Sequence, residues 1–262
     1  MINGRLRLDK PRNVKGAWSD IKFKGAHNLT GELKVVSIYR ENGQYWASLP
    51  FEVMVPEKTK TGVKTAVDVN VGHLDYTAGR VNTLPSHLQK IYKRIKHYQR
   101  VLARKRKVNG RLATQSKNYA KTRAKLQRDY RRVANVQHDL MQKFTTQLVN
   151  TYDQLVIEDL AVKKMQMSHV AAKGLQRSMF GYFRQVLTYK CEWYGKILSV
   201  ADRFYPSTQR CSVCGHIKQG DDKVTLAGNH KHHTKHDEYI CYQCGATLDR
   251  DANAVANLLA LI

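Results

Sequence analysis

Four of the five cysteines in this 262-residue chain stand in two Cys-x-x-Cys-Gly motifs whose spacing suits a metal ion. The motifs are Cys211-Ser-Val-Cys214-Gly215 and Cys241-Tyr-Gln-Cys244-Gly245, with 26 residues between them. Each motif forms a tight turn that places two thiolates on one side of the chain, and two turns complete a tetrahedral site. Because a site with four protein ligands is closed, we predict a structural Zn²⁺ bound by Cys211, Cys214, Cys241 and Cys244.

Two further features could bind metal or react. The histidine-rich run from Asn229 to His236 could hold a second ion, but we interpret it as a solvated loop that adds positive charge below pH 7. The fifth cysteine, Cys191, lies in a predicted helix without a partner nearby. We interpret it as a buried apolar position.

Three acidic residues are candidates for a catalytic metal site. Asp68 lies in a predicted strand, Glu158 ends an apolar run typical of a buried parallel strand, and Asp251 lies in the first turn of the last predicted helix. Metal-dependent hydrolysis of a phosphodiester needs carboxylates that converge on two cations, and Mg²⁺ prefers oxygen ligands. Each acid alone also has a structural interpretation: a lone polar strand residue, a sheet-edge residue and a helix N-terminal acid.

A basic segment follows the first of these acids. Between Ser86 and Arg132 the chain has 17 Lys and Arg residues and one acid, Asp129. A solvated helix surface usually mixes both signs of charge, so we interpret this excess as a nucleic-acid contact that neutralises phosphates. The candidate binding residues are Lys90, Lys93, Arg94, Lys96, Arg100, Arg104, Lys105, Arg106, Lys107, Lys121, Lys125 and Arg128.

Helical periodicity shows how this segment is positioned. Apolar residues recur at helical spacing in its first half: Leu88, Ile91, Tyr92, Ile95, Tyr98 and Leu102. Val108-Asn109-Gly110 predicts a helix end and a turn. A second series has a seven-residue period, widened by Tyr130, Phe144 and Leu148: Leu112, Tyr119, Leu126, Val133 and Leu140. We therefore predict a long helical hairpin over about residues 86–150, with facing apolar seams and basic outer faces.

The remaining segments complete an α/β organisation. We expect a β-rich domain over residues 1–56, with a hairpin at Asn42-Gly43, and a polar connector before a strand over Val63 to Val71. Further strands are expected at Leu155 to Asp159 and Ile197 to Ala201, with a helix over 171–195. The cysteine module covers 208–246, and the α/β domain comprises residues 63–207 and 247–262.

Composition restricts the class of protein. The formal charge is +24 and the pI is near 9.9, which indicates a polyanionic partner, and nucleic acid is the default. A hydrophobic fraction of 42% argues against disorder, and no apolar stretch reaches the length of a transmembrane helix. The first ten residues lack the apolar core of a signal peptide. We therefore expect a cytoplasmic protein, associated with the nucleoid in a bacterium, and no membrane partner.

Three segments together resemble the TnpB/OrfB family: YDQLVIEDLAVKKM (152–165), YKCEWYGKILSVADRFYPSTQRCSVCG (189–215) and CYQCGATLDRDANAVANLL (241–259). These transposon-encoded proteins have a RuvC-like nuclease domain and are related to type V CRISPR effectors. The resemblance covers roughly residues 30–262. It implies an RNase H-like fold with an inserted basic hairpin and a zinc ribbon, preceded by a partial wedge domain.

By motif, the resemblance assigns catalytic roles to the three acids. Asp68 in AVDVNVG, Glu158 in VIEDL and Asp251 in DRDANA would bind Mg²⁺, as two ions, with Asp249 the alternative to Asp251. The implied activity is RNA-guided DNA endonuclease activity, in proteins commonly labelled transposases and linked to transposition and DNA recombination. DNA and a guide RNA are the implied partners, with the basic hairpin along the guide–target channel.

The sequence departs from the family in two places. The usual N-terminal lobe is missing, so we expect a truncated form. HLDYTAGR (73–80) is more polar than the family's apolar second strand. A nuclease-silent DNA- or RNA-binding remnant or repressor is therefore the alternative, and a structural zinc-ribbon protein is a weaker one.

Overall fold

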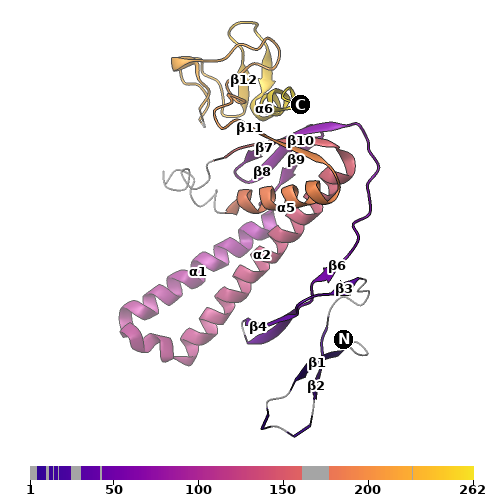
Figure 1. Cartoon of the computed structure of the whole chain (residues 1–262). Helices are drawn as coiled ribbons and strands as arrows, with labels where there is room; N and C mark the ends of the chain where they lie inside the picture. Colours follow the sequence, from indigo (N-terminus) through magenta and orange to yellow (C-terminus); the bar gives the residue numbers. More distant parts are fainter. Residues whose placement is uncertain are drawn as a thin grey trace. The chain divides into compact units, whose positions relative to one another are not determined.

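The computed structural model of the chain describes residues 5–9, 12–13, 15–16, 18–24, 31–41, 43–160, 177–225 and 227–262. The chain divides into two compact units, Met1–Val55 and Pro56–Ile262. The described residues of the first unit form three antiparallel strand pairs, drawn in indigo in Figure 1. They are β1 (Arg5–Asp9) with β2 (Trp18–Lys22), β3 (Glu32–Leu33) with β6 (Phe51–Glu52), and β4 (Ser37–Glu41) with β5 (Gln44–Ser48).

The β4–β5 hairpin confirms the turn predicted from the sequence. Its strands pair from Ser37 with Ser48 to Glu41 with Gln44, which leaves only two residues in the turn. Gly43 has a φ of 81°, a conformation that glycine adopts without steric cost.

A five-stranded mixed sheet forms the centre of the second unit, in the order β11-β10-β7-β8-β9. The strands β7, β8 and β9 form an antiparallel meander, and β10 runs parallel to both β7 and β11. Their bounds are β7 (Lys64–Asn70), β8 (His73–Tyr76), β9 (Gly79–Asn82), β10 (Gln154–Glu158) and β11 (Ile197–Ala201). The predicted α/β class is confirmed.

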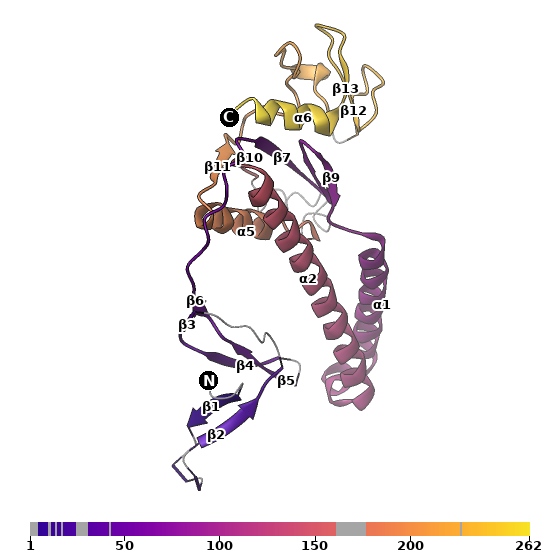
Figure 2. The same cartoon turned by 90° about the vertical axis from the view of Figure 1, so that its right-hand side faces the viewer.

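Helices cover both faces of this sheet (Figures 1 and 2). On one face lie α2 (Lys117–Thr151) and α5 (Phe180–Trp193), and on the other lies α6 (Arg250–Leu259). The other described elements are α1 (Ser86–Asn109), the 3₁₀ helices η1 (Gly110–Gln115) and η2 (Gly220–Asp222), and the pair β12 (Glu238–Ile240) with β13 (Thr247–Asp249).

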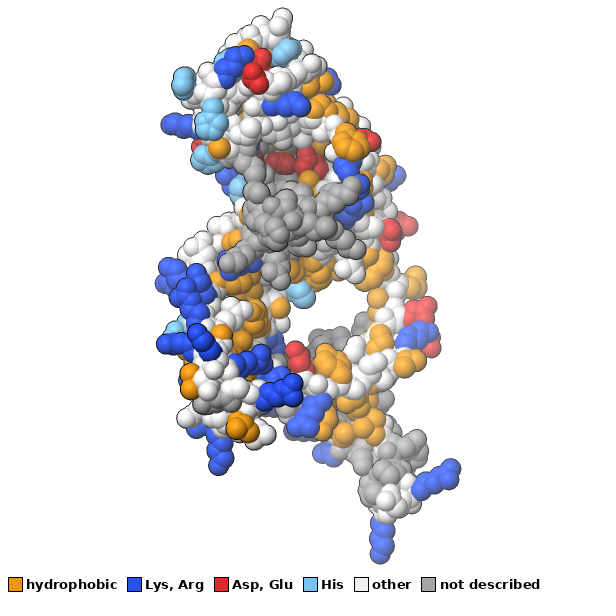
Figure 3. Space-filling view, turned by 90° about the vertical axis from the view of Figure 1, so that its left-hand side faces the viewer, with side chains coloured by type: hydrophobic (Ala, Val, Ile, Leu, Met, Phe, Trp, Pro, Cys, Tyr) orange, Lys and Arg blue, Asp and Glu red, His pale blue; other side chains and the backbone are white. Residues whose placement is uncertain are grey.

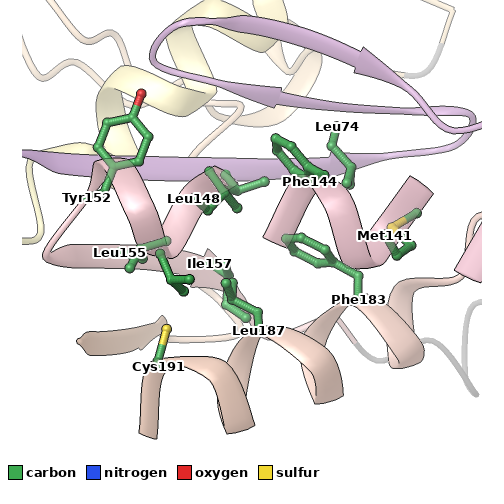
Figure 4. Close-up of a cluster of buried hydrophobic side chains, with 12 residues drawn as sticks. Leu74, Met141, Phe144, Leu148, Tyr152, Leu155, Ile157, Phe183, Leu187 and Cys191 are labelled. Carbon is green, nitrogen blue, oxygen red and sulfur yellow. The ribbon is translucent and has the colours of Figure 1, made fainter. Parts of the chain in front are cut away.

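Apolar side chains of the strands separate into two cores. Val67, Leu155 and Ile157 join residues of α2 and α5 in the larger core, shown in Figure 4. Ala66 and Val156, one position along their strands, join Val255 and Leu258 of α6 in the smaller core. Each fully buried side chain of this size contributes about 1.5–3 kcal/mol, so the register of these strands is strongly fixed.

The predicted helical hairpin is present as α1 and α2, joined at Gly110, which has a φ of 54°. Leu88, Ile91, Ile95 and Val133 are buried along the seam. Two seam predictions are wrong. Leu112 is 71% exposed because it lies in η1, before α2 begins, where the seven-residue period does not apply. Tyr130 is 44% exposed because it lies beside the seam, where its hydroxyl accepts a hydrogen bond from Gln99.

The helix predicted over 171–195 is interrupted just before α5, although Arg177 is helical. Among the described residues α5 starts at Phe180, directly after Met179, whose φ of 59° is left-handed and incompatible with a continuing helix. The part of that prediction at 171–176 lies outside the described residues. Among the described helices, none combines the length and the apolar character that crossing a lipid bilayer requires.

Candidate functional site

Successive side chains of a strand point to opposite faces of the sheet, and the face that α6 covers carries several polar side chains. Because Ala66 lies on this face, Asp68 and Asn70 of β7 lie on it too. The β7–β8 register pairs Asp68 with Asp75 and Asn70 with His73, so β8 adds two more polar residues to the same face.

Asp68 and Glu158 form one part of this acidic cluster. Ile157 of β10 pairs with Val67 of β7, so the next residue, Glu158, lies beside Asp68. Asp68 is 6% exposed and accepts a hydrogen bond from Asn70 at 2.7 Å. Burial and the neighbouring Glu158 charge raise the pKa of Asp68 to about 7. Burial also raises the pKa of Glu158, although Ser207 donates a hydrogen bond to it.

Asp251 approaches the same face from α6. It is 5% exposed and lies in the first turn of the helix. Asp249, the alternative ligand, is exposed, and its carboxylate accepts the Ala252 N–H at 2.8 Å as the N-cap of α6. The structure therefore brings Asp251 to the acidic cluster and gives Asp249 a capping role.

The hairpin of β8 and β9 contributes three side chains that the sequence did not single out. Arg80 donates to Asp75 Oδ1 at 2.6 Å and to Asp251 Oδ2 at 2.8 Å. His73 Nε2 lies 3.2 Å from Asp75 Oδ2 and 3.3 Å from Asp251 Oδ2. The ligand atoms of His73, Asp75 and Asp251 all lie within 4.8 Å of one another. The unusual polarity of residues 73–80 was the available signal.

These contacts set opposite pKa values within one cluster. Hydrogen bonds to Asp251 and Asp75 raise the pKa of His73 to about 9. Burial alone would raise the pKa of Asp251, but the hydrogen bonds from His73 and Arg250 outweigh burial and lower it to about 2. The pKa of Asp251 is thus lowered in its cation-rich surroundings, whereas the pKa of Asp68, which forms no ion pair among the described residues, is raised.

A pocket of about 210 Å³ opens beside Glu158, between the ends of β10 and β11 and α6. Asp159 and Arg203 also line it, and Asp159 forms ion pairs with Arg184 at 2.7 Å and with Arg203. Asp159 is therefore engaged in its own contacts, although it follows Glu158 directly. In Figure 3, acidic side chains are grouped in a recess close to the cysteine module.

The four predicted cysteines form a second, separate cluster. Their sulfur atoms lie within 4.8 Å of one another, with 3.8 Å between Cys211 and Cys244 and 3.6 Å between Cys214 and Cys241. A tetrahedron with metal–sulfur bonds of about 2.3 Å has edges of about 3.8 Å, so these separations suit a zinc ion. Cys191 lies apart in the main core, and burial raises the pKa of its thiol to about 12.

The two motifs fold into equivalent turns. Cys211 N–H donates to His216 O and Cys241 N–H to Ala246 O, both at 2.8 Å. Gly215 and Gly245 donate back to the same cysteines at 2.9 Å, with φ values of 79° and 75°. Glycine is needed at both positions because other residues rarely adopt this φ.

A buried lysine lies next to the cysteine cluster. Lys218 is 1% exposed, and its Nζ lies 4.2 Å from the ring centres of both Tyr239 and Tyr242. In the described part of the chain, this ammonium group has no hydrogen-bond acceptor. The histidine-rich run is mostly exposed, as predicted, and His232 stacks on Tyr242 and contacts Asp222 at 2.8 Å.

Helix α6 joins the cysteine module to the acidic cluster. Asn253 Oδ1 accepts the Ser212 N–H at 2.9 Å, and Asn253 Nδ2 donates to Arg210 O at 2.7 Å. Asn257 Nδ2 donates to the carbonyls of Ser207 and Arg210. Both asparagines are at most 2% exposed, so these bonds fix the helix that carries Asp251 against the first cysteine turn.

The candidate nucleic-acid-binding residues lie along the α1–α2 hairpin, where Lys and Arg side chains gather in Figure 3. All twelve are exposed except Lys105, which is half-buried. Two of them have internal partners: Arg94 forms a bidentate ion pair with Asp129 at 2.8 and 2.9 Å, and Arg106 donates to Tyr119 Oη at 2.7 Å. Arg94 therefore neutralises the one acid of this segment.

Sequence comparisons identify relatives of both halves of the second unit. Residues 48–169 match the OrfB_IS605 family, described as "Probable transposase". Residues 180–258 match the family described as "Cas12f1-like, TNB domain". The chain is therefore similar to proteins of the TnpB/OrfB family. The OrfB match contains Asp68 and Glu158, and the second match contains Asp251 and all four clustered cysteines.

Individual relatives align along most of the chain. A Streptomyces pristinaespiralis protein named "Putative RNA-guided DNA endonuclease" is 31% identical over 98% of this chain. An Escherichia coli K12 protein named "Putative RNA-guided DNA endonuclease InsQ" is 28% identical over 92%. The chain spans 59% of the length of each. A cryo-EM structure of the Cas12f1-sgRNA-target DNA complex aligns with 86% of this chain and 55% of that chain, at 14% identity and a TM-score of 0.47.

Proposed function

We propose that this chain acts as the nuclease core of a transposon-associated, RNA-guided DNA endonuclease, with Asp68, Glu158 and Asp251 as ligands of divalent metal. The observation that carries the proposal is the convergence of these acids on one sheet face, from elements far apart in the sequence. The five-stranded mixed sheet, in which a meander is followed by two parallel strands, supports the RuvC-like, RNase H-type fold that the resemblance implies.

The chemistry of the residues fits Mg²⁺. The donors are carboxylate oxygens, which this ion prefers. Among the described residues neither Asp68 nor Glu158 forms an ion pair. Burial and the neighbouring Glu158 charge raise the pKa of Asp68, and a bound cation would offset both. Bound divalent ions would activate water and stabilise the leaving oxygen of a phosphodiester. The chain itself orients Asp68 through Asn70 and Glu158 through Ser207.

The other two features support nucleic-acid binding by the same chain. The exposed Lys and Arg side chains of the α1–α2 hairpin suit the phosphate backbone of a guide RNA and target DNA. The cysteine cluster suits a structural Zn²⁺ held by Cys211, Cys214, Cys241 and Cys244. Through Asn253 and Asn257, this zinc module would hold α6, and with it Asp251, in place.

Cleavage and metal binding test the proposal together. The full chain, with the RNA that copurifies with it, is assayed on labelled DNA in Mg²⁺ or Mn²⁺, and Mn²⁺ binding is followed by electron paramagnetic resonance. Asp68→Asn, Glu158→Gln and Asp251→Asn should each lower cleavage by on the order of 10³-fold while DNA affinity stays unchanged. Asp68→Asn and Glu158→Gln should also weaken Mn²⁺ binding.

Neighbouring acids give matched controls. Asp159→Asn and Asp249→Asn remove one carboxylate each, one and two positions away from a proposed ligand, and should keep Mn²⁺ binding. The double variant Lys96→Gln/Arg100→Gln should show the reverse pattern, with weaker DNA binding and an intact metal site. Cleavage at the wild-type rate by all three acid variants would refute the site. A wild-type chain that binds DNA and leaves it uncut in both metals would favour a binding protein instead.

A further inference from the structure

Positive charge is distributed unevenly over the four carboxylates of the acidic cluster. Among the described residues, ion pairs reach only Asp75 and Asp251, from His73, Arg80 and Arg250. The hydrogen bonds given to Asp68 and Glu158 come from the uncharged side chains of Asn70 and Ser207. The cluster therefore consists of a neutralised pair, Asp75 and Asp251, and an open pair, Asp68 and Glu158.

The carboxylate of Asp251 has no acceptor position left for a metal ion. Arg250 donates to Oδ1 through Nε at 3.2 Å and Nη2 at 2.9 Å. Oδ2 lies 2.8 Å from Arg80 Nη2 and 3.3 Å from His73 Nε2. Each carboxylate oxygen has two lone pairs, and these four contacts approach all of them, with His73 Nε2 shared with Asp75 Oδ2 at 3.2 Å. A metal ion can bind Asp251 only after one of these donors has left.

Arg80 is the donor that can leave most easily. Its side chain is 49% exposed, compared with 26% for His73 and 13% for Arg250. It projects from β9, the edge strand of the sheet, and its guanidinium group can be rehydrated when it withdraws. Arg250 directly precedes Asp251 on the same helix and cannot move far from it.

We propose that Arg80 is a built-in counter-cation that competes with divalent metal for Asp251. While Arg80 holds Asp75 and Asp251, a divalent ion binds at Asp68 and Glu158, and Asp251 becomes a ligand only when Arg80 withdraws into solvent. Metal loading is therefore sequential, with one stronger and one weaker step. This inference rests on the proposed function, and it gives the polar segment 73–80 a role that the family pattern did not predict.

Manganese titration of the full, zinc-loaded chain tests the inference, with electron paramagnetic resonance reporting bound Mn²⁺. The wild type should bind Mn²⁺ in two steps of different affinity. Arg80→Gln should strengthen the weaker step by about tenfold, and Arg80→Lys, which keeps the charge, should change it less. The Mg²⁺ concentration for half-maximal cleavage should fall in Arg80→Gln. Circular dichroism and zinc content confirm that each variant is folded.

Arg203→Gln is the matched control, because Arg203 is 48% exposed, lies near Glu158 and pairs with Asp159 rather than Asp251. If Arg203→Gln strengthened the weaker Mn²⁺ step as much as Arg80→Gln, the change in net charge alone would explain the effect, and the inference would be overturned. The affinity of the weaker Mn²⁺ step could also stay the same in Arg80→Gln while cleavage and Asp68-dependent Mn²⁺ binding remain intact. That result would overturn the role of Arg80 but not the proposed function. Absence of both cleavage and Asp68-dependent binding in the wild type would overturn the proposed function as well.

Discussion

The two clusters of candidate metal ligands in the second unit are built in opposite ways. The cysteine cluster comes from two short turns with the same hydrogen bonds, and its sulfur atoms already lie at the separations of a tetrahedral zinc site. The acidic cluster is assembled by sheet register from three strands and a helix, and part of it is occupied by the chain's own cations. The cysteine cluster is thus closed by contacts between nearby residues, whereas the acidic cluster depends on contacts between distant segments and can change its cation partners.

The cation beside each cluster shows the same difference. Lys218 is buried and packed between two tyrosine rings, so it cannot leave. Arg80 is half-exposed and hydrogen-bonded directly to the carboxylates. The buried Lys218 suits a site that would keep its ion. The half-exposed Arg80 suits a site whose ions would enter and exchange.

The largest expected effect is the loss of zinc from the closed site. Cys241→Ser should lower the zinc content from one ion per chain to near zero, because the remaining three thiolates leave the tetrahedron open and structural zinc supplies folding free energy, about 10–16 kcal/mol in isolated zinc fingers. Atomic absorption measures the content. Cys191→Ala is the control, since this buried cysteine lies outside the cluster and its loss should leave zinc bound. Full zinc retention in Cys241→Ser would break the comparison.

A smaller effect is expected at the open pair of Asp68 and Glu158, where a substitution should stabilise the fold rather than destabilise it. The folded-state pKa of Asp68, about 7, lies above its ordinary value. The contribution of protonated Asp68 to the free energy of unfolding is therefore fully present below about pH 4 and decreases as the pH rises towards 7. Asp68→Asn removes this ionisation. Without added divalent metal, its advantage in free energy of unfolding over the wild type should grow between pH 5 and pH 8 by on the order of 2 kcal/mol.

Urea denaturation at the two pH values measures this difference. Asp159→Asn serves as the reference, because Asp159 is held in ion pairs and its pKa is lowered. If the wild type gained stability relative to Asp68→Asn as pH rises, the description of the open pair as uncompensated charge would be wrong.

The smallest effect concerns the fixed cation. Four thiolates around Zn²⁺ leave a net charge of −2, and the Lys218 ammonium lies close enough to interact with Cys241 and Cys211. Lys218→Met should keep the packing between the tyrosine rings but lose this charge, and should weaken zinc binding by about tenfold. Competition with a chromophoric chelator gives the affinity. Lys223→Met, at an exposed position of the same module, should leave it unchanged; equal losses in both variants would remove the special role of Lys218.

Sequence patterns predicted the features that depend on nearby residues. The cysteine turns, the hairpin at Gly43, the α1–α2 hairpin and the strands carrying Asp68 and Glu158 follow from short-range spacing and alternation. Asp75, His73 and Arg80 were missed because their position depends on the pairing of β7, β8 and β9, which aligns Asp68 with Asp75 and Asp75 with Arg80. The exposure of Leu112 and the helix interruption at Met179 were missed because a 3₁₀ turn and a left-handed residue break the helical phase.

The span of the acidic cluster along the chain has a consequence for the order of folding. Asp68 and Asp251 are separated by 183 positions, whereas each cysteine pair closes within four residues. Contacts between distant residues form late, because the entropy of closing a long loop must be overcome first. The cysteine turns and the α1–α2 hairpin can therefore form while β7 still lacks both β10 and α6. With the proposed role of the hairpin, a partly folded chain would bind nucleic acid before its carboxylates have come together.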